Sequence, residues 1–290
     1  MAGACAAPVF APGSTAGEFT FDTGVLRGKL HASGKSIGLS EVVHVPSGRR
    51  LDRSMGLFSI YRVFTRAARF GTGAWDWPSD ATLRDDGSVE INWRPDRSRP
   101  FHLQATYRWR DESTVGMETA VTPSADLAGF EVFLASYFSE SFSNALVYAR
   151  AAAGDVSPIL VPVGQRAGTW QIFPRDAAAV SVISDGRWRI NPNPIEWAIQ
   201  PEYALPLAIR RHPVSGLGAL IMAPMMDCFA VATPHQTEPH YSTYLCLFGR
   251  DLKSGSTVRA RAALAFTGKF SEGELKEIYG RCVGPPGPKQ

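Results

Sequence analysis

The sequence predicts an all-β protein, a large antiparallel sandwich of two sheets with one short C-terminal helix. Three observations support this fold class. Apolar and polar residues alternate along many short segments, as in strands that bury one face. Turn-forming dipeptides separate these segments, and only one segment has the spacing of an amphipathic helix. The length of 290 residues suits a single β-sandwich, since all-β domains of more than about 200 residues occur.

The strand predictions rest on alternation and on turn signals. In 101–109 every second residue is apolar, and 258–266 begins with the same pattern. Asp86-Gly87 and Asp185-Gly186 are examples of the turns that bound such segments. The same reasoning predicts further strands at 17–22, 25–31, 37–45, 57–66, 88–93, 113–122, 129–138, 168–173, 178–184, 204–211, 216–223 and 228–233.

A helix is predicted only near the C-terminus. Ser271 and Glu274 have the spacing of a capping box, and Leu275, Ile278 and Tyr279 follow at helical intervals.

The chain is predicted to form one folded domain. No linker or internal repeat interrupts 17–283, so this range is expected to be a single β-sandwich. Residues 1–16 show no clear periodic pattern and are expected to be flexible. The sequence GPPGPKQ of 284–290 cannot continue a helix and is expected to be disordered.

Composition excludes several classes of function. The net charge of +3 and the dispersed basic residues argue against nucleic-acid binding. No apolar run is long enough for a membrane helix, and the N-terminus lacks signal-peptide features, so a cytoplasmic protein is expected. No CxxC pair, GxSxG, Walker A, GxGxxG or HExxH motif occurs. The cysteines therefore predict neither a zinc ribbon nor a disulfide scaffold, and Cys246 is expected to be a small buried apolar residue.

The richest stretch for chemistry runs from Asp227 to Asp251. His240, Ser242 and Tyr244 occur at i, i+2 and i+4, so an extended segment would place all three on one face of a sheet. Glu238 would join that face if the strand began early. Histidine can donate or accept a proton near neutral pH, and a nearby carboxylate can orient it. These residues predict a catalytic group of His240, Glu238 and Tyr244, while a hydrogen-bonded histidine beside a solvated glutamate is the structural alternative.

A metal site remains open as an alternative. His235, Glu238 and His240 are ordinary ligand types, and Asp227 could add another oxygen. Their spacing matches no helix-borne metalloenzyme motif. No cofactor is therefore predicted, although a divalent metal would use these residues.

Trp75, Asp76 and Trp77 follow the glycine-rich sequence Phe70-Gly71-Thr72-Gly73. Exposed indoles on a loop would form flat apolar platforms for a sugar ring, and Asp76 could bind its hydroxyls. The alternative is that both tryptophans close the end of the sandwich, as large aromatics often do.

Several arginines are further candidates for substrate binding. Arg62 falls on the apolar face of its predicted strand, where a cation needs an ion-pair partner or a ligand. Arg175, Asp176, Arg187 and Trp188 lie on predicted loops, where binding groups concentrate on β scaffolds. Structural ion pairs are the alternative at each position.

The number and lengths of the strands, with a late strand that bears a histidine, resemble the galactose-mutarotase-like supersandwich proteins. These include aldose epimerases and the sandwich domains of polysaccharide lyases and glycoside hydrolases. The resemblance covers roughly 17–270. It implies a supersandwich fold, a sugar substrate, and an acid and a base on the concave sheet. At matching positions these would be His240 with Glu238 or Asp227.

These observations predict a carbohydrate-active enzyme that cleaves a glycosidic bond, by hydrolysis or β-elimination, or epimerises a sugar. Each of these reactions needs a positioned proton donor and acceptor. The expected partner is a sugar or glycan, with no nucleic acid and no membrane, and the oligomeric state is open. Two other functions remain alternatives: a carbohydrate-binding sandwich that stacks sugars on Trp75, Trp77 and Trp188, and a structural or assembly protein.

Overall fold

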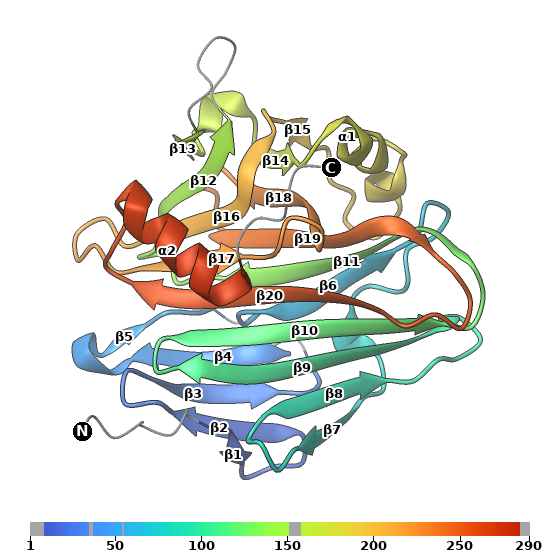
Figure 1. The fold of residues 1–290 in the computed structure, drawn as a ribbon, viewed down its shortest axis with the longest axis horizontal. Coiled ribbons are helices and arrows are strands. Elements are labelled where there is room, and N and C mark those ends of the chain that lie inside the picture. Colours follow the sequence, from blue (N-terminus) through green and yellow to red (C-terminus); the bar gives the residue numbers. More distant parts are fainter. Residues whose placement is uncertain (1–8, 35–36, 54, 151–157, 285–290) are drawn as a thin grey trace.

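The computed structural model of the protein describes residues 9–34, 37–53, 55–150 and 158–284. Its strands form three hydrogen-bonded sheets that stack as two layers (Figure 1). The nine-stranded sheet is one layer. The six-stranded and five-stranded sheets, connected by the bridge between Leu39 and Leu57, form the other. The predicted all-β, two-layer sandwich is therefore confirmed.

The nine-stranded sheet contains the two segments with the clearest alternation, now β9 and β20. The apolar residues of β9 are buried and the polar residues between them are more exposed, as the pattern predicts. Three of its strands, β7, β12 and β13, were not predicted. In spatial order the strands are β13 (Pro158–Pro162), β12 (Asn144–Arg150), β16 (Tyr203–Arg211), β17 (Gly218–Met222), β20 (Val258–Thr267), β10 (Thr114–Pro123), β9 (Phe101–Asp111), β8 (Val89–Trp93) and β7 (Asp80–Leu83).

The second layer is antiparallel except at one edge, where β14 and β15 pair in parallel. Its six-stranded part has the order β15 (Ala198–Ile199), β14 (Trp170–Pro174), β18 (Cys228–Pro234), β19 (Ser242–Leu252), β11 (Leu127–Tyr137) and β6 (Ser59–Phe64). Its five-stranded part has the order β1 (Ala11–Pro12), β2 (Glu18–Asp22), β3 (Leu26–His31), β4 (Gly38–His44) and β5 (Arg49–Arg50).

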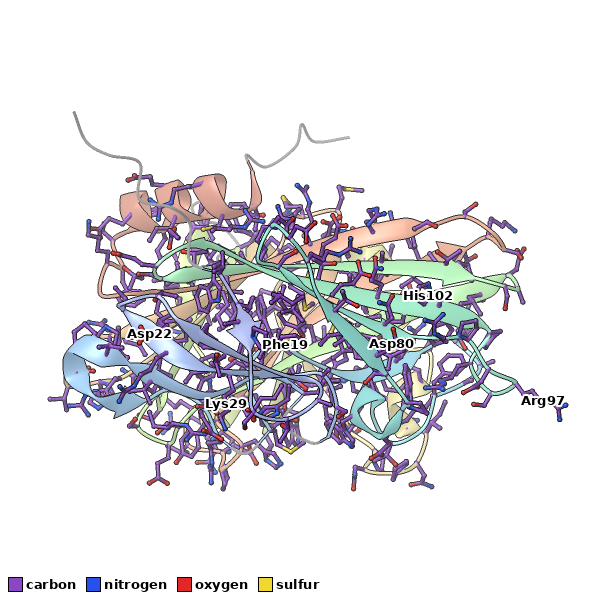
Figure 2. All side chains as sticks on the ribbon, turned by 90° about the horizontal axis from the view of Figure 1, so that it is seen from below. Phe19, Asp22, Lys29, Asp80, Arg97 and His102 are labelled. Carbon is purple, nitrogen blue, oxygen red and sulfur yellow. The ribbon has the colours of Figure 1, made fainter. Side chains whose placement is uncertain are left out.

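The core lies between the two layers. Side chains such as that of Phe19 fill this space (Figure 2). Arg210 of β16 reaches across it and donates from Nε to the hydroxyl of Thr243 in β19, at 3.2 Å. Thr243 therefore marks the inner face of β19. Because side chains alternate along a strand, Ser242 and Tyr244 lie on the outer face of this sheet.

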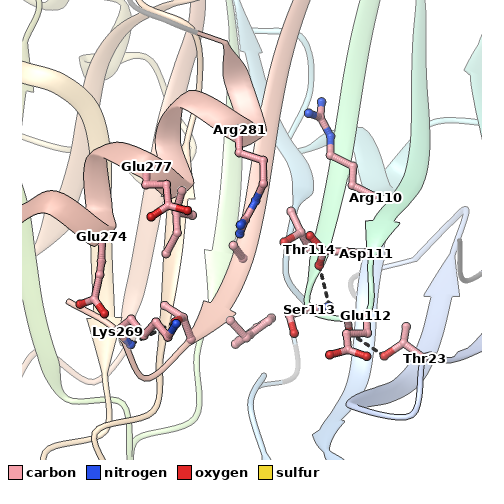
Figure 3. Close-up of a pocket in the computed structure, with 14 residues that line it drawn as sticks. Thr23, Arg110, Asp111, Glu112, Ser113, Thr114, Lys269, Glu274, Glu277 and Arg281 are labelled. Carbon is pink, nitrogen blue, oxygen red and sulfur yellow. Dashed lines mark hydrogen bonds between the residues drawn. The ribbon is translucent and has the colours of Figure 1, made fainter. Parts of the chain in front are cut away.

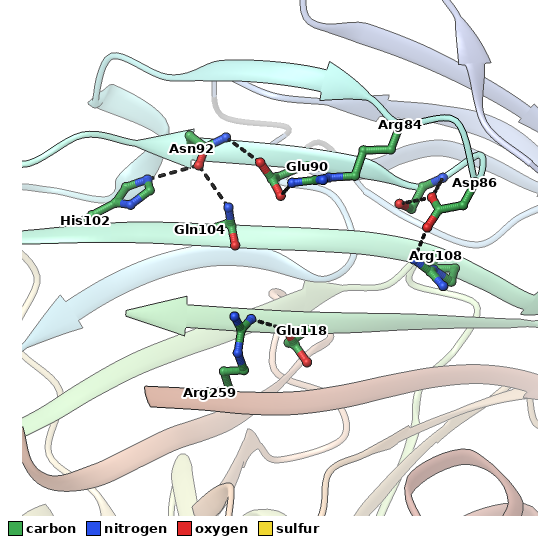
Figure 4. Close-up of polar contacts among 10 residues, drawn as sticks. Arg84, Asp86, Glu90, Asn92, His102, Gln104, Arg108, Glu118 and Arg259 are labelled. Atoms are coloured by element: carbon green, nitrogen blue, oxygen red, sulfur yellow. Dashed lines mark hydrogen bonds and ion pairs between the residues drawn. The ribbon is translucent and has the colours of Figure 1, made fainter. Parts of the chain in front are cut away.

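The outer face of the nine-stranded sheet is polar and internally paired (Figure 4). The side-chain oxygen of Asn92 hydrogen-bonds with Nε2 of His102 at 3.0 Å and accepts from the amide of Gln104 at 3.2 Å. Arg259 pairs with Glu118 on the neighbouring strand. Cross-strand pairs of this kind satisfy a solvated β surface without implying a ligand.

The described residues include two α-helices, and the predicted one is confirmed. α2 (Glu272–Val283) starts at Ser271, whose side chain and that of Glu274 form the reciprocal hydrogen bonds of a capping box. Leu275 and Tyr279 bury the inner side of this helix against the nine-stranded sheet. No helix within the described ranges is long and apolar enough to cross a membrane.

The predicted strand at 178–184 is wrong, because this segment forms α1 (Ala177–Ile183). The carboxylate of Asp176 accepts the backbone N–H of Ala179 at 2.8 Å and caps the helix. The β-branched residues of the segment suggested a strand, whereas the cap and the alanines after it favour a helix. The part of the chain that the structure describes also has four short 3₁₀ turns: η1 (Val45–Ser47), η2 (Ala74–Asp76), η3 (Gln165–Ala167) and η4 (Arg187–Arg189).

The N-terminal segment is more ordered than expected where the structure describes it. Ala11–Pro12 pairs with β2, and Phe10 is buried against Phe21 and Trp109. The rest of the predicted flexible start, residues 1–8, and the predicted disordered tail from 285 onward lie outside the described residues.

Candidate active site

The outer face of the six-stranded sheet differs from that of the opposite layer because aromatic residues dominate it. Strand register builds this face. Phe133 of β11 lies opposite Arg62 of β6, and Tyr137 lies opposite Ser242 of β19. The ring of Tyr244 stacks on that of Phe133 with centroids 4.4 Å apart. Five side chains from three neighbouring strands thus share one surface.

Two loops cover part of this surface. The η2 loop places Trp75 on the ring of Tyr61, with centroids 4.4 Å apart. The η4 loop and the segment after it bring Trp188 and Trp197 against Phe133, at 4.7 and 6.2 Å. Sheet residues therefore line the surface, and indoles from loops distant in sequence cover part of it.

The expectation that the tryptophans form exposed platforms is wrong. Trp75 and Trp77 are each 7% exposed, and Trp188 is 3% exposed. Trp77 packs against Phe101 and lies under the guanidinium of Arg99, 4.5 Å from ring centroid to Cζ. Packing against the sandwich explains the burial, because a large apolar indole is more stable in contact with the sheet than exposed to water. Asp76, between the two indoles, is exposed.

Glu238 and His240 meet in the turn that joins β18 to β19. Nδ1 of His240 lies 2.7 Å from Oε1 of Glu238, and the backbone N–H of His240 donates to Oε2 at 2.9 Å. The Glu238 side chain is largely buried, whereas that of His240 is 55% exposed. The imidazole is thus held from one side by a buried carboxylate, and Nε2 faces away from it.

The same turn corrects the reasoning that placed His240 on a strand. β19 begins at Ser242, and Tyr241 has a left-handed backbone with φ of 46°, so alternation does not continue back to His240. The turn nevertheless directs the imidazole toward the aromatic face. Its ring lies 5.3 Å from that of Trp170 and 6.4 Å from that of Tyr137, between centroids.

Two tyrosines lie beside one another near His240, with the ring centroids of Tyr137 and Tyr244 6.0 Å apart. The Ser242 hydroxyl donates to the hydroxyl of Tyr244 at 2.6 Å. Burial raises the pKa of Tyr244 to about 12 and holds the pKa of Tyr137 well above its ordinary value. Both phenols therefore stay protonated near neutral pH. They can orient a polar ligand by hydrogen bonds but cannot serve as phenolate bases.

Arg62 is the most unusual residue of the face. Its side chain is buried, with the residue 4% exposed, and Nη2 donates only to the Tyr61 hydroxyl, at 3.3 Å. Nε and Nη1 have no hydrogen-bond partner, and no ion pair of Arg62 occurs within the described ranges. Its Cζ lies 4.8 Å from the ring centroid of Tyr61 and 5.5 Å from that of Trp188. Burial of an unpaired cation costs roughly several kcal/mol, and aromatic contacts offset only part of that cost.

The other charged candidates have structural partners. Arg175 pairs with Asp176 at 2.8 Å, while Asp176 caps α1. Arg187 is fully buried and pairs with Glu131 at 3.1 Å and with Asp185 at 2.7 Å. These contacts fit the structural alternative for Arg175, Asp176 and Arg187. Burial outweighs the attraction of Arg187 and raises the pKa of the Glu131 carboxyl to about 7.

The residues considered for a metal do not converge. Nδ1 of His235 bonds to the hydroxyl of Thr237 at 3.2 Å, and Glu238 is engaged with His240. Asp227 accepts the backbone N–H of Arg261 at 2.9 Å, on the neighbouring layer. Among the residues that the structure describes, no group of three or more histidine, cysteine or acidic side chains is arranged to hold a metal ion.

A separate cleft of about 720 Å³ lies between α2, the β9–β10 hairpin and β20 (Figure 3). It is lined by charges of both signs. Arg110 donates to the backbone carbonyl of Cys282, and the Glu274 side chain is committed to the capping box of α2. Glu274, Glu277 and Arg281 of α2 lie with Lys269 on one side of the cleft, and Arg110, Asp111 and Glu112 of the hairpin lie on the other (Figure 3). It offers no histidine and no buried unpaired charge, so the aromatic face remains the better candidate.

Sequence reasoning missed Tyr137, Trp170 and Trp197. Tyr137 could have been found, because it falls at i+4 from Phe133 in a strand that was predicted. Trp170 and Trp197 come from different segments and reach the site only through packing. No local pattern signals that convergence.

No protein-family model and no curated protein matches the sequence. Solved structures do resemble the fold. A galactose mutarotase related enzyme from Lactobacillus acidophilus matches with a TM-score of 0.50 and 9% identity, covering 86% of this chain and 97% of that one. A mutant of a heparan sulfate lyase from Pedobacter heparinus matches 91% of this chain with a TM-score of 0.52 and 8% identity. An α-N-acetylgalactosaminidase from Bifidobacterium bifidum matches 95% of it with a TM-score of 0.52 and 9% identity.

The chain spans 37% of the length of each of the last two proteins, so it corresponds to one part of those larger chains. At such low identities the likeness concerns the fold alone. The strand order, the two layers and these matches agree. The chain therefore has the galactose-mutarotase-like supersandwich fold.

Proposed function

We propose that the protein is a carbohydrate-active enzyme whose site is the outer face of the six-stranded sheet. The observation that carries this proposal is the Glu238–His240 pair, with its 2.7 Å contact, at the rim of a face lined by aromatic rings and hydroxyls. Trp170 and Trp197 are only partly buried, so their rings can stack on the apolar side of a sugar, and hydroxyls bind its polar edge. In this proposal the imidazole of His240 lies beside the bound sugar and gives a proton to it or takes one from it.

His240 is the proton-transfer group in this proposal. Glu238 bonds to Nδ1, which fixes the ring and leaves Nε2 to exchange a proton with a ligand oxygen or carbon acid. The carboxylate also stabilises the imidazolium that forms when Nε2 accepts a proton. Tyr137 and Tyr244, both protonated, would orient the sugar beside it.

Epimerisation or β-elimination fits the site better than hydrolysis. Most glycosidases place two carboxyl groups on opposite sides of the bond to be cleaved. On this face Glu238 is bound to His240, and Glu131 is bound to Arg187. In either reaction one group takes a proton and another gives one, and His240 would accept the first proton while the hydroxyl of a protonated tyrosine, Tyr137 or Tyr244, would donate the second. The reaction class is therefore proton abstraction or donation without a nucleophilic carboxylate.

A screen of sugars and glycans tests the proposal. Proton NMR exchange between anomers reports epimerisation, and ultraviolet absorbance of an unsaturated product reports elimination. The wild type is compared with His240→Ala and with His102→Ala. His102 is a matched control because it lies on the polar outer face of the opposite sheet, bonded to Asn92. The proposal predicts activity that only His240→Ala abolishes.

The carbohydrate-binding alternative gives a different result. A sugar bound equally by the wild type and by His240→Ala, and never transformed, would show a binding module. The burial of Trp75 and Trp188 weighs against that alternative, because it removes the exposed stacking platforms on which it depended.

A further inference from the structure

Arg62 is not alone on the aromatic face. Phe64 and Arg69 pair across an antiparallel bridge, and Arg62 precedes Phe64 by two residues. Because residues two apart share a face, and so do cross-strand partners, both guanidinium groups project to the same side. Arg69 lies 6.0 Å from the ring centroid of Phe64, and Arg62 lies 5.5 Å from that of Trp188. These two rings are themselves 4.7 Å apart.

No acidic side chain compensates these two positive charges in the described part of the chain. Arg69 donates to the backbone carbonyls of Gly71 at 3.0 Å, Thr72 at 2.7 Å and Pro192. None of these acceptors carries a charge. Burial and the nearby charge of Arg62 lower the pKa of Arg69 to about 10, so Arg69 remains cationic near neutral pH.

Two acidic residues beside this face, Glu131 and Asp185, are already paired. Glu131 lies opposite Phe64 in the sheet, but its carboxylate pairs with Arg187, as does that of Asp185. The burial that raises the pKa of Glu131 reduces its negative charge further. Among the described residues Arg187 therefore has acidic partners, whereas neither Arg62 nor Arg69 forms an ion pair.

Comparison with Arg210 shows that Arg62 is not an ordinary buried arginine. Arg210 also lacks an acidic partner, but it donates to the hydroxyls of Thr243 and Thr233 and to the carbonyl of Ser242, at 2.7 to 3.2 Å. It is thus mostly satisfied inside the core. Arg62 makes one long hydrogen bond, so four of its five N–H groups have no acceptor among the described residues, including the one on Nε and the two on Nη1.

We propose that Arg62 and Arg69 bind the oxyanion group of an acidic sugar, the carboxylate of a hexuronate or the phosphate of a hexose phosphate. This inference rests on the proposed function and names its substrate class. An oxyanion offers acceptors to the free N–H groups of Arg62 and supplies the missing negative charge. Successive ring contacts connect Arg62 to His240 through Tyr61, Phe133, Tyr244 and Tyr137, so the proposed anion site and the imidazole belong to one continuous surface.

Calorimetric binding to the full chain tests the inference. The ligands are galacturonate, glucuronate, glucose 6-phosphate and the neutral sugars galactose and glucose. Either the uronates or the sugar phosphate should bind, and the ligand that binds shows whether the oxyanion is a carboxylate or a phosphate. The matching neutral sugar should bind at least about tenfold more weakly, because it leaves the buried donors unpaired.

The variants separate this inference from the proposed function. Arg62→Met and, measured separately, Arg69→Met should each remove the preference for the acidic sugar. Arg259→Met is the matched control, because Arg259 pairs with Glu118 on the opposite sheet. His240→Ala should keep the preference and lose only turnover. Circular dichroism verifies that each variant is folded. Arg69 is only half-buried, so Arg69→Met should fold even if Arg62→Met does not, and it then provides a second test of the site.

Each outcome of these measurements supports or contradicts the anion site, the proposed catalytic role, or both. Equal affinity for neutral and acidic sugars would overturn the anion site while leaving the proposed enzyme intact. An acidic preference that survives both arginine variants would overturn it as well. Acidic sugars bound through Arg62, with turnover unaffected by His240→Ala, would support the anion site and overturn the proposed catalytic role. No binding of any sugar would overturn both.

Discussion

Glu238 contacts His240 twice, through Nδ1 of the imidazole at 2.7 Å and through the backbone N–H at 2.9 Å. One buried carboxylate thereby fixes both the side chain and the backbone of the residue that presents a free Nε2 to the aromatic face. The pair needs no long-range partner, since both residues belong to one turn. Mutation of Glu238 or His240 can therefore test the chemical role of the pair without disturbing the packing of the sandwich.

His240→Ala is expected to lower turnover of the substrate by about 10²–10⁴-fold, because a positioned acid or base is lost. Glu238→Gln should lower it less, since the amide can still bond to Nδ1 but no longer stabilises an imidazolium. Rates are measured by NMR or absorbance on whichever sugar the screen identifies. His102→Ala, on the opposite sheet, should retain the wild-type rate. A wild-type rate in His240→Ala would remove the acid–base assignment.

Arg62→Met is expected to leave stability unchanged or to raise the free energy of unfolding by about 1–4 kcal/mol, because methionine fills the volume without an unpaired charge. Arg210→Met is the contrasting variant. It loses hydrogen bonds to Thr233, Thr243 and the carbonyl of Ser242, so it should lower stability by about 1–3 kcal/mol. Urea unfolding measures both changes. Equal destabilisation by the two substitutions would contradict the view that Arg62 is retained for a ligand.

The Glu131 carboxyl should make stability depend on pH. Its pKa is raised to about 7 in the folded protein from an ordinary value of 4.5, so the folded state binds more protons than the unfolded state between these limits. Its contribution to stability is fully present below about pH 4.5 and is lost as the pH rises through about 7. Glu131→Gln should remove this component, which is found as the wild-type minus variant difference in unfolding free energy across that range. A difference that stays constant with pH would show that Glu131 titrates normally.

Asp176→Ala is expected to lower the free energy of unfolding by about 1 kcal/mol through loss of the N-cap of α1, and to leave sugar affinity unchanged. Thermal unfolding and calorimetry report the two effects independently. Asp176→Asn should restore most of the stability, because an asparagine side chain can also cap. A loss of affinity in Asp176→Ala would return this residue to the binding site where sequence reasoning placed it.

Local patterns predicted the parts of the fold that local physics determines. The alternation of apolar and polar residues in β9 predicts which face is buried, and the spacing of Ser271 and Glu274 predicts where α2 begins. α1 was misassigned because its β-branched residues resemble a strand, while the decisive feature is one capping carboxylate before three alanines. The edge strands β1, β5 and β15 have two residues each, which is too short for any period to appear.

The candidate site was predictable only where it is local in sequence. Glu238 and His240 are two residues apart, so their contact could be anticipated even though the strand assumed for it was wrong. The burial of Trp75 depends on Tyr61, and that of Trp188 on Phe133, which are partners that only tertiary packing identifies. The arrangement of Arg69 beside Arg62 likewise depends on a hairpin bridge that composition does not reveal.

The hairpin that pairs Phe64 with Arg69 and the turn that pairs Glu238 with His240 belong to separate stretches of chain on one surface. In the proposed site, ligand selection and proton transfer are therefore encoded independently. Substitutions in the hairpin can redirect the protein toward a differently charged sugar while the turn keeps its chemistry. A scaffold divided in this way can diversify its substrates through changes of a few residues, without rebuilding the reaction each time.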